Sequence, residues 1–214
     1  MKKFLAIFLT LLLVLGLAAC GGSSEEPAEE STPETTTEAE TETPADDAEE
    51  ETTETEAGKV LVVYFSATGT TKGVAEKIAD ITGADIYEIK AAQEYTSDDL
   101  NYNDPNSRTS MEQDDSAFRT EIGSDPVSLD GYTTVYIGYP IWWGEEPRIM
   151  DTFVESYNFD GITMIPFCTS GSSGIGRSGE HLKTNAGTGN WLDGQRFNGS
   201  TTEDELREWI EGLQ

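Results

Sequence analysis

The chain has 214 residues, with 13 Lys and Arg against 41 Asp and Glu, so that its formal net charge is −28. A chain this acidic repels nucleic acid and favours partners with a basic face, and we expect no nucleic-acid partner. With one histidine and two cysteines, it lacks the clustered ligands of a usual zinc site, and no metal site is predicted.

The first 20 residues have the pattern of a targeting segment. Lys2 and Lys3 precede an apolar run over 4–19 that ends in small residues. A charged start and a short apolar stretch are typical of an export signal, and the stretch is too short for a comfortable membrane span. Because Cys20 and two glycines follow, the segment resembles a bacterial lipoprotein signal. The resemblance implies cleavage before Cys20, lipidation of its thiol and an extracytoplasmic domain anchored to the cell membrane. A plain secretory signal with an incidental cysteine is the alternative.

Residues 21–57 form a low-complexity acidic segment rich in Thr, Glu and Pro. It contains fifteen acidic residues, no basic residue and no aromatic residue. Such a segment cannot bury enough apolar surface to offset chain entropy, so we predict a disordered linker that its own charge keeps extended. The folded domain is therefore expected over 58–214.

The first folded stretch predicts a strand, a hydroxyl-rich turn and a helix. Residues 60–65 are continuously β-branched or apolar, as in a strand buried on both faces of a parallel sheet, and a helical pattern covers 72–81. The turn between them supplies Ser66, Thr68, Gly69, Thr70 and Thr71. Hydroxyls and free N–H groups at a helix N-terminus favour a phosphate site. The alternative is that Ser66 and Thr68 only cap the helix.

The remaining pattern alternates between strands and helices. We expect, in chain order, a strand over 84–90, a long connection or lid over 91–128 with a short helix at 110–121, a strand over 132–138, a helix over 145–157, a strand over 162–168, a helix over 174–185, a strand over 191–197, and a last helix that begins with a capping box of Thr201 or Thr202 and Glu205. This alternation predicts an α/β domain with a mostly parallel sheet.

Two further loops follow predicted strands and share an enrichment in Gly, Ser, Thr or Trp. Their candidate binding residues are Pro140, Ile141, Trp142, Trp143 and Gly144 in one loop, and Thr169, Ser170, Gly171 and Gly174 in the other. Ligands of parallel sheets bind beyond the carboxyl ends of the strands, where all three loops should meet. Adjacent indoles are costly to expose, so we expect one to stack on a planar ligand and one to pack. Together the loops predict a ligand with a phosphate and a flat aromatic ring system.

At these three loops the domain resembles the flavodoxin family. The turn at 66–71 stands where that family binds phosphate, and 140–144 and 169–174 stand where its loops contact the isoalloxazine ring. The resemblance implies a three-layer flavodoxin-like fold, with a five-stranded parallel sheet of order 2-1-3-4-5 and helices on both faces. It also implies that the domain binds FMN and transfers electrons. The long 91–128 connection and the lipid anchor depart from simple flavodoxins, and they leave the electron donor and acceptor open.

Other functions remain open at this stage. The same fold and cofactor would serve an FMN-dependent NAD(P)H:quinone-type oxidoreductase, so whether the protein is an enzyme is undecided and no catalytic residue is assigned. A flavin-binding module without a redox role is a third possibility. The GxGxxG match at 174–179 is poorly placed for a dinucleotide site, because it follows the fourth strand instead of the first. We expect Cys168 to be a small buried residue and His181 to be an ordinary surface residue of a helix.

Overall fold

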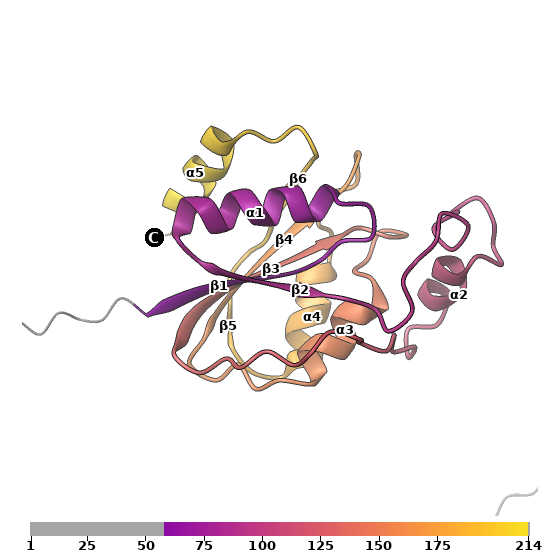
Figure 1. Ribbon diagram of the computed structural model, residues 1–214, viewed down its shortest axis with the longest axis horizontal. Coiled ribbons are helices and arrows are strands. Elements are labelled where there is room, and N and C mark those ends of the chain that lie inside the picture. Colours follow the sequence, from indigo (N-terminus) through magenta and orange to yellow (C-terminus); the bar gives the residue numbers. More distant parts are fainter. Residues whose placement is uncertain (1–57, 214) are drawn as a thin grey trace, which may run out of the picture. The chain divides into compact units, whose positions relative to one another are not determined.

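The computed structural model describes residues 58–213. The predicted signal over 1–20, the predicted lipidation of Cys20 and the predicted linker over 21–57 lie outside the described residues. Within them, one parallel sheet forms the middle layer (Figure 1). Its strands are β1 (Lys59–Phe65), β2 (Asp85–Ile89), β3 (Tyr132–Pro140), β4 (Thr163–Thr169), β5 (Asn190–Trp191) and β6 (Gln195–Phe197). The order is β2-β1-β3-β4-β5, with β6 also paired to β4, which confirms the predicted topology.

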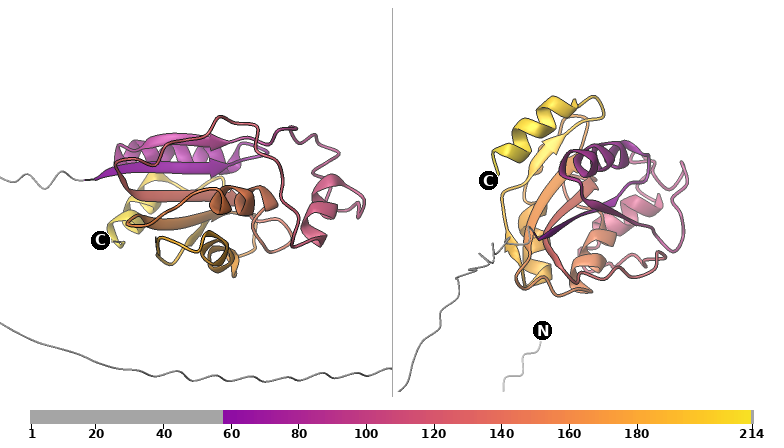
Figure 2. Two further views of the ribbon diagram at one scale, coloured as in Figure 1. Left: turned by 90° about the horizontal axis from the view of Figure 1, so that it is seen from below. Right: turned by 60° about the vertical axis from the view of Figure 1, so that its left-hand side comes forward.

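Helices cover both faces of the sheet, and each face has its own hydrophobic cluster. One face packs against α1 (Thr70–Thr82) and α5 (Glu203–Glu211), and the other against α3 (Arg148–Glu155) and α4 (Ser178–Ala186), as Figure 2 shows. Alternate residues of β1 enter the two clusters, because successive side chains of a strand point to opposite faces. Strand β1 is therefore buried on both sides, as its continuous apolar run predicts.

The strand predicted over 191–197 is divided into β5 and β6. The Leu192 N–H still donates to the Met164 carbonyl of β4 at 2.9 Å. In a parallel ladder the return bond to Leu192 would come from the N–H of residue 166, and Pro166 has none. Pairing therefore stops after Leu192 and resumes at Gln195.

Two helices begin later than predicted. Helix α3 starts at Arg148 instead of 145, because Glu145 exchanges backbone hydrogen bonds with Trp142, and Pro147 is the N-cap residue. Helix α4 starts at Ser178 instead of 174, after a turn in which Gly176 has a φ of +58°. By contrast, α1 begins two residues before the predicted 72, since the Gly73 N–H donates to the Gly69 carbonyl and closes an earlier turn.

The last helix begins as predicted. The Thr202 hydroxyl accepts from the Glu205 N–H, and the Glu205 carboxylate accepts from the Thr202 N–H, so the capping box is complete. Cys168 of β4 is fully buried, as expected. Among the described residues, no helix has both the length and the apolar character that crossing a membrane requires.

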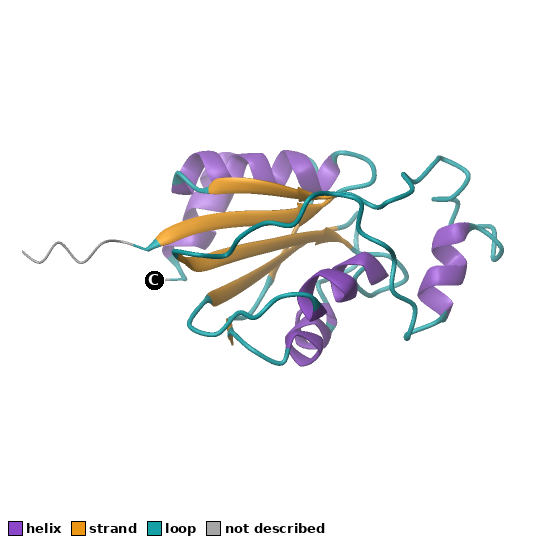
Figure 3. Ribbon diagram, turned by 60° about the horizontal axis from the view of Figure 1, so that its bottom comes forward, coloured by secondary structure: helices purple, strands orange, loops and turns teal. Residues whose placement is uncertain are grey.

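Residues 91–122 of the long connection between β2 and β3, closed by an antiparallel bridge between Ala91 and Ile122, form a lobe beyond the carboxyl ends of the strands (Figures 1 and 3). Its helix, α2 (Arg108–Asp114), is shorter than the predicted 110–121. Ser107 caps its N-terminus by accepting from the Ser110 N–H. Its C-terminus lies at Asp115, whose carboxylate accepts from the Ala117 N–H and so favours a turn over further helix. The lobe lies beside the edge of the sheet at which the three candidate loops are found.

Candidate functional site

The loop after β1 presents the N-terminus of α1 to solvent. Gly69 is the N-cap residue with a φ of +86°, a region in which side chains are strained, and no side chain caps the helix. The Ser66 hydroxyl accepts from the Gly69 N–H at 3.1 Å, while Thr68, Gly69 and Thr70 are exposed. The first N–H groups of a helix have no intrahelical partner, so this turn offers donors and hydroxyls to an anion.

Thr71 lies differently from the other hydroxyl residues of that turn. Its side chain is buried, and its hydroxyl lies 2.8 Å from that of Thr169, at the end of β4. This buried contact between the two threonines joins the first loop to the third loop. Both are predicted binding residues, and the structure gives their side chains a structural contact.

The loop after β3 folds back in a tight two-residue turn. Trp142 and Glu145 exchange two backbone hydrogen bonds, of 2.9 and 3.0 Å, around Trp143 and Gly144. Both central residues have positive φ, +51° for Trp143 and +89° for Gly144, which is the pattern of a type I′ turn. Trp143 is the only non-glycine residue among those described with positive φ. A large side chain held in this region is strained, and such strain clusters at functional sites.

The two indoles have different environments. Trp142 packs edge-on against Phe65 and Tyr95, with ring centroids 5.6 and 5.2 Å apart. Trp143 is 48% exposed. Trp142 is therefore the packed indole, and Trp143 has a free face on which a planar ligand can stack.

The loop after β4 is held by a residue that the sequence reasoning missed. Arg196 of β6 donates to the carbonyls of Ser170 and Gly171 at 2.6 and 2.7 Å, and to the Ser170 hydroxyl at 3.1 Å. The Ser170 hydroxyl also donates to the Ser173 carbonyl. The only signal in the sequence was that Arg196 is the single basic residue of the predicted last strand.

A cavity of about 420 Å³ lies where the first and second loops meet the lobe. It is lined by Thr68, Leu100, Tyr102, Thr109, Ile141, Trp142 and Trp143. Leu100, Tyr102 and Thr109 are not among the predicted binding residues, because the lobe has no periodic pattern that would place them. An exposed indole, an apolar wall and nearby anion donors suit a ligand with a planar ring and a phosphate.

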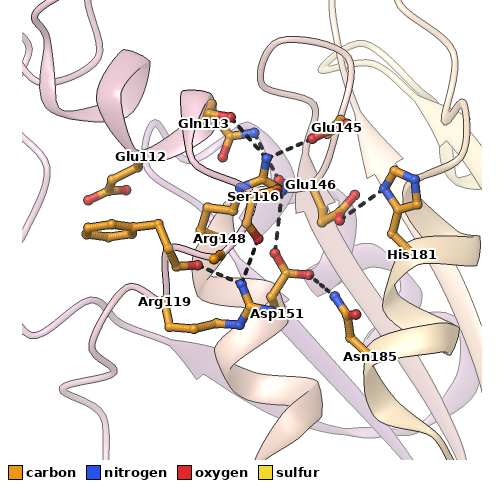
Figure 4. Close-up of polar contacts among 12 residues, drawn as sticks. Glu112, Gln113, Ser116, Arg119, Glu145, Glu146, Arg148, Asp151, His181 and Asn185 are labelled. Carbon is orange, nitrogen blue, oxygen red and sulfur yellow. Dashed lines mark hydrogen bonds and ion pairs between the residues drawn. The ribbon is translucent and has the colours of Figure 1, made fainter. Parts of the chain in front are cut away.

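The lobe is attached to the second loop through Gln113 of α2. Its side-chain amide donates to the backbone carbonyls of Trp142 and Glu146 at 3.2 and 3.1 Å, and the Gln113 backbone carbonyl accepts from Arg148 Nη2 at 3.0 Å. These contacts fix the position of the turn relative to α2 and α3 (Figure 4).

The family model described as Flavodoxin matches residues 59–213. The chain belongs to the flavodoxin family. A candidate flavoprotein from Bacteroides uniformis is 45% identical, with a TM-score of 0.69, over 72% of this chain and 98% of its own. One from Bacteroides eggerthii is 44% identical, with a TM-score of 0.68, over 73% of this chain and 98% of its own. No match was found among curated protein sequences.

A more distant flavodoxin relative carries the cofactor. The flavoprotein from Lactobacillus acidophilus, whose structure is a complex with FMN, is 25% identical with a TM-score of 0.54, over 72% of this chain and 99% of its own. In the present chain, the donors at 68–70, the free face of Trp143 and the third loop meet at one edge of the sheet, which fits a flavin mononucleotide.

Proposed function

We propose that this flavodoxin-family protein is an electron-transfer protein that works outside the cytoplasmic membrane, where a lipidated Cys20 holds it. Its cofactor is FMN. The observation that carries the proposal is that the loops after β1, β3 and β4 meet at the carboxyl edge of the sheet. Because the chain belongs to the flavodoxin family, we infer that this edge binds the flavin.

Each loop has a role in this proposal. The exposed turn at Thr68, Gly69 and Thr70 binds the phosphate through N–H groups and hydroxyls. The indole of Trp143 covers one face of the ring, and the loop that Arg196 holds contacts the ring edge. When bound, FMN accepts and donates electrons, and the protein orients the ring and excludes water from it.

The acidic surface suits a partner with a basic face. From residue 58 onward the sequence has 26 acidic and 11 basic residues. A field of this sign speeds encounter with a basic surface by electrostatic steering, which depends on ionic strength. The acidic linker would hold the domain away from the membrane so that such a partner can reach it.

The second candidate is an FMN-dependent NAD(P)H:quinone-type oxidoreductase. A second cavity of about 580 Å³, lined in part by Tyr102 and Met111 of the lobe and by Trp143, favours it, because a small planar acceptor would fit there beside the cavity proposed for the flavin. A carrier and an enzyme differ in their source of electrons. Purified protein loaded with FMN should be mixed with NADH or NADPH and a soluble quinone. The carrier leaves the nicotinamide absorbance unchanged until a partner reductase is added, whereas rapid loss of that absorbance supports the enzyme.

Cofactor binding is tested at Thr68. The wild-type protein should retain FMN in a one-to-one ratio and show the visible spectrum of bound flavin. Thr68→Glu places a carboxylate beside the phosphate and should weaken binding by about a hundredfold or more, since opposing like charges costs several kcal/mol. Thr68→Ser keeps the hydroxyl and should bind normally. Stoichiometric flavin in the glutamate variant would show that this turn does not bind the phosphate.

Anchoring is tested separately. In cells that express the full chain, the protein should fractionate with the membrane, and Cys20→Ser should release it. A wild-type protein found in the soluble fraction would contradict the anchor without affecting the flavin site.

A further inference from the structure

Several charged side chains are buried directly behind the Trp142–Glu145 turn (Figure 4). Glu146 and Asp151 are each 1% exposed, and Arg148 is 4% exposed. Arg148 Nη1 lies 3.6 Å from an Asp151 oxygen, and its Nη2 donates to Glu145 at 2.8 Å. Glu146 Oε1 lies 3.4 Å from Nδ1 of His181 on α4. The electron-transfer proposal uses none of these side chains.

The buried charges of this cluster do not balance. Two buried carboxylates, Glu146 and Asp151, face one buried guanidinium, Arg148, which also pairs with the half-buried Glu145. From the other elements, Asn185 of α4 donates to Asp151 at 2.9 Å, and Gln113 of α2 donates to the backbone of Glu146. Burying an excess carboxylate is costly unless a proton neutralises it, so the cluster calls for one proton.

Glu146 is the group best placed to hold that proton. Its pKa is raised to about 8, chiefly by burial; the Asp151 and Glu145 carboxylates act in the same direction, and Arg148 opposes them. The pKa of Asp151 is also raised by burial, but Asn185 and the cations Arg119 and Arg148 favour its charged form. Glu146 Oε2 is buried and has no hydrogen-bonding partner among the described residues. The imidazole of His181 is 31% exposed and lies between Glu146 and solvent, which corrects the prediction that it is an ordinary surface residue.

We propose that Glu146 and His181 form a proton-binding pair that takes up a proton when electrons reach a flavin held at the Trp142–Glu145 turn and releases it when they leave. This inference rests on the proposed function. The electrons come from the redox partner and the proton comes from solvent by way of His181. Near and above pH 8, where Glu146 is partly or fully ionised before reduction, its carboxylate and one proton become the carboxylic acid on reduction, which offsets negative charge added nearby.

The coupling follows from position. Glu146 comes directly after the turn, and its carbonyl and that of Trp142 share the Gln113 amide as donor. The carboxylate is thus fixed relative to the ring-contacting loop in a poorly solvated place, where charges interact more strongly than in water. Added negative charge at the turn must raise the affinity of Glu146 for a proton.

The pair itself is tested without the cofactor. His181 is the only histidine of the chain, so its NMR signals are assigned without ambiguity. In the cofactor-free protein, the side-chain carboxyl carbon of Glu146 should titrate near the raised value of about 8, and the imidazole signals should move at the same pH. Glu146→Gln should abolish that step. Glu180→Gln, an exposed change on the same helix beside His181, should retain it. A Glu146 that ionises at its ordinary value of about 4.5 would overturn the proposal.

The coupling is tested on the FMN-loaded protein by counting protons. Reduction with dithionite in weak buffer at about pH 9 should take up more protons in the wild type than in Glu146→Gln, by up to one, and the two should agree at about pH 6. The midpoint potential should show the same difference in its pH dependence. Equal proton uptake by the wild type and by Glu146→Gln at both pH values would overturn the coupling. If Glu146→Gln does not fold, the carboxyl-carbon titration of wild-type Glu146 is recorded in the cofactor-free, the oxidised FMN-loaded and the reduced FMN-loaded protein, and an unchanged midpoint on reduction would overturn the coupling. Failure of the protein to bind FMN would remove the proposed function and the coupling, whereas the NMR titration would judge the pair independently.

Discussion

The hydroxyls of Thr71 and Thr169 lie 2.8 Å apart and are buried, although the two residues are 98 positions apart in the chain. Thr71 lies at the start of α1, and Thr169 ends β4. Because the phosphate-binding turn ends at Thr71 and the third loop begins after Thr169, this contact helps to set the distance between the two loops.

Replacing one of these threonines should destabilise the protein more than replacing both. Thr71→Val preserves the shape but leaves the Thr169 hydroxyl buried without its partner, and we expect a loss of about 1–3 kcal/mol of unfolding free energy. The double Thr71→Val, Thr169→Val variant should recover most of that loss, since no polar group is then left unpaired. Urea denaturation of the four proteins measures the coupling, and additive losses would contradict it.

Trp143→Asn should stabilise the cofactor-free protein while weakening FMN binding. Asn adopts positive φ more readily than Trp does, so relief of strain at the first central position of the turn should add about 1 kcal/mol. Loss of the indole removes a stacking surface and should weaken FMN binding by about tenfold. Urea denaturation and a flavin fluorescence titration give the two quantities. Unchanged FMN affinity would mean that Trp143 does not contact the ring.

Stability should fall as the pH rises from about 4.5 to about 8. Over this window the raised pKa of Glu146 lets the folded state keep a proton that the unfolded chain has lost. Unfolding therefore releases one proton, and it becomes more favourable as the pH rises. Glu146→Gln should flatten the slope and exceed the wild type in stability above about pH 8. The exposed Glu180→Gln change should leave the pH dependence of stability unaltered. Parallel curves for wild type and Glu146→Gln would contradict the raised pKa.

Arg196→Lys should loosen the third loop. A lysine cannot reproduce the three contacts of the guanidinium with Ser170 and Gly171, and loss of charge-assisted hydrogen bonds should cost about 1–3 kcal/mol. Faster FMN release should accompany it in stopped-flow measurements. Arg177→Lys, a change on the exposed side of the same loop, is the matched control and should behave as wild type. Equal rates of FMN release from Arg196→Lys and Arg177→Lys would contradict the role of Arg196.

Local patterns were enough to predict the sheet and the candidate loops. The apolar run before Ser66 identifies a strand buried on both faces, and the Thr202 and Glu205 pair places the start of the last helix where the structure has it. Strand alternation predicted an α/β domain with a mostly parallel sheet, and the three loop compositions predicted the edge at which the loops meet, whereas the strand order came from the resemblance to the flavodoxin family.

Contacts between distant segments could not be predicted in this way. The late start of α3 depends on backbone bonds between Trp142 and Glu145, and the break in the last strand depends on the missing N–H of Pro166 in a neighbouring strand. The roles of Gln113, His181 and Arg196 arise only when α2, α4 and β6 are in place. None of these contacts has a periodic signature.

The deep burial of Cys168 has a consequence for handling and for the proposed location. Burial raises the pKa of this thiol to about 12, so almost none of it is thiolate at neutral pH, and the thiolate is the form that attacks other sulfur atoms. A domain exported to an oxidising compartment can therefore carry this cysteine without mixed-disulfide formation. Purified in air without reductant, it should yield no covalent dimers through Cys168.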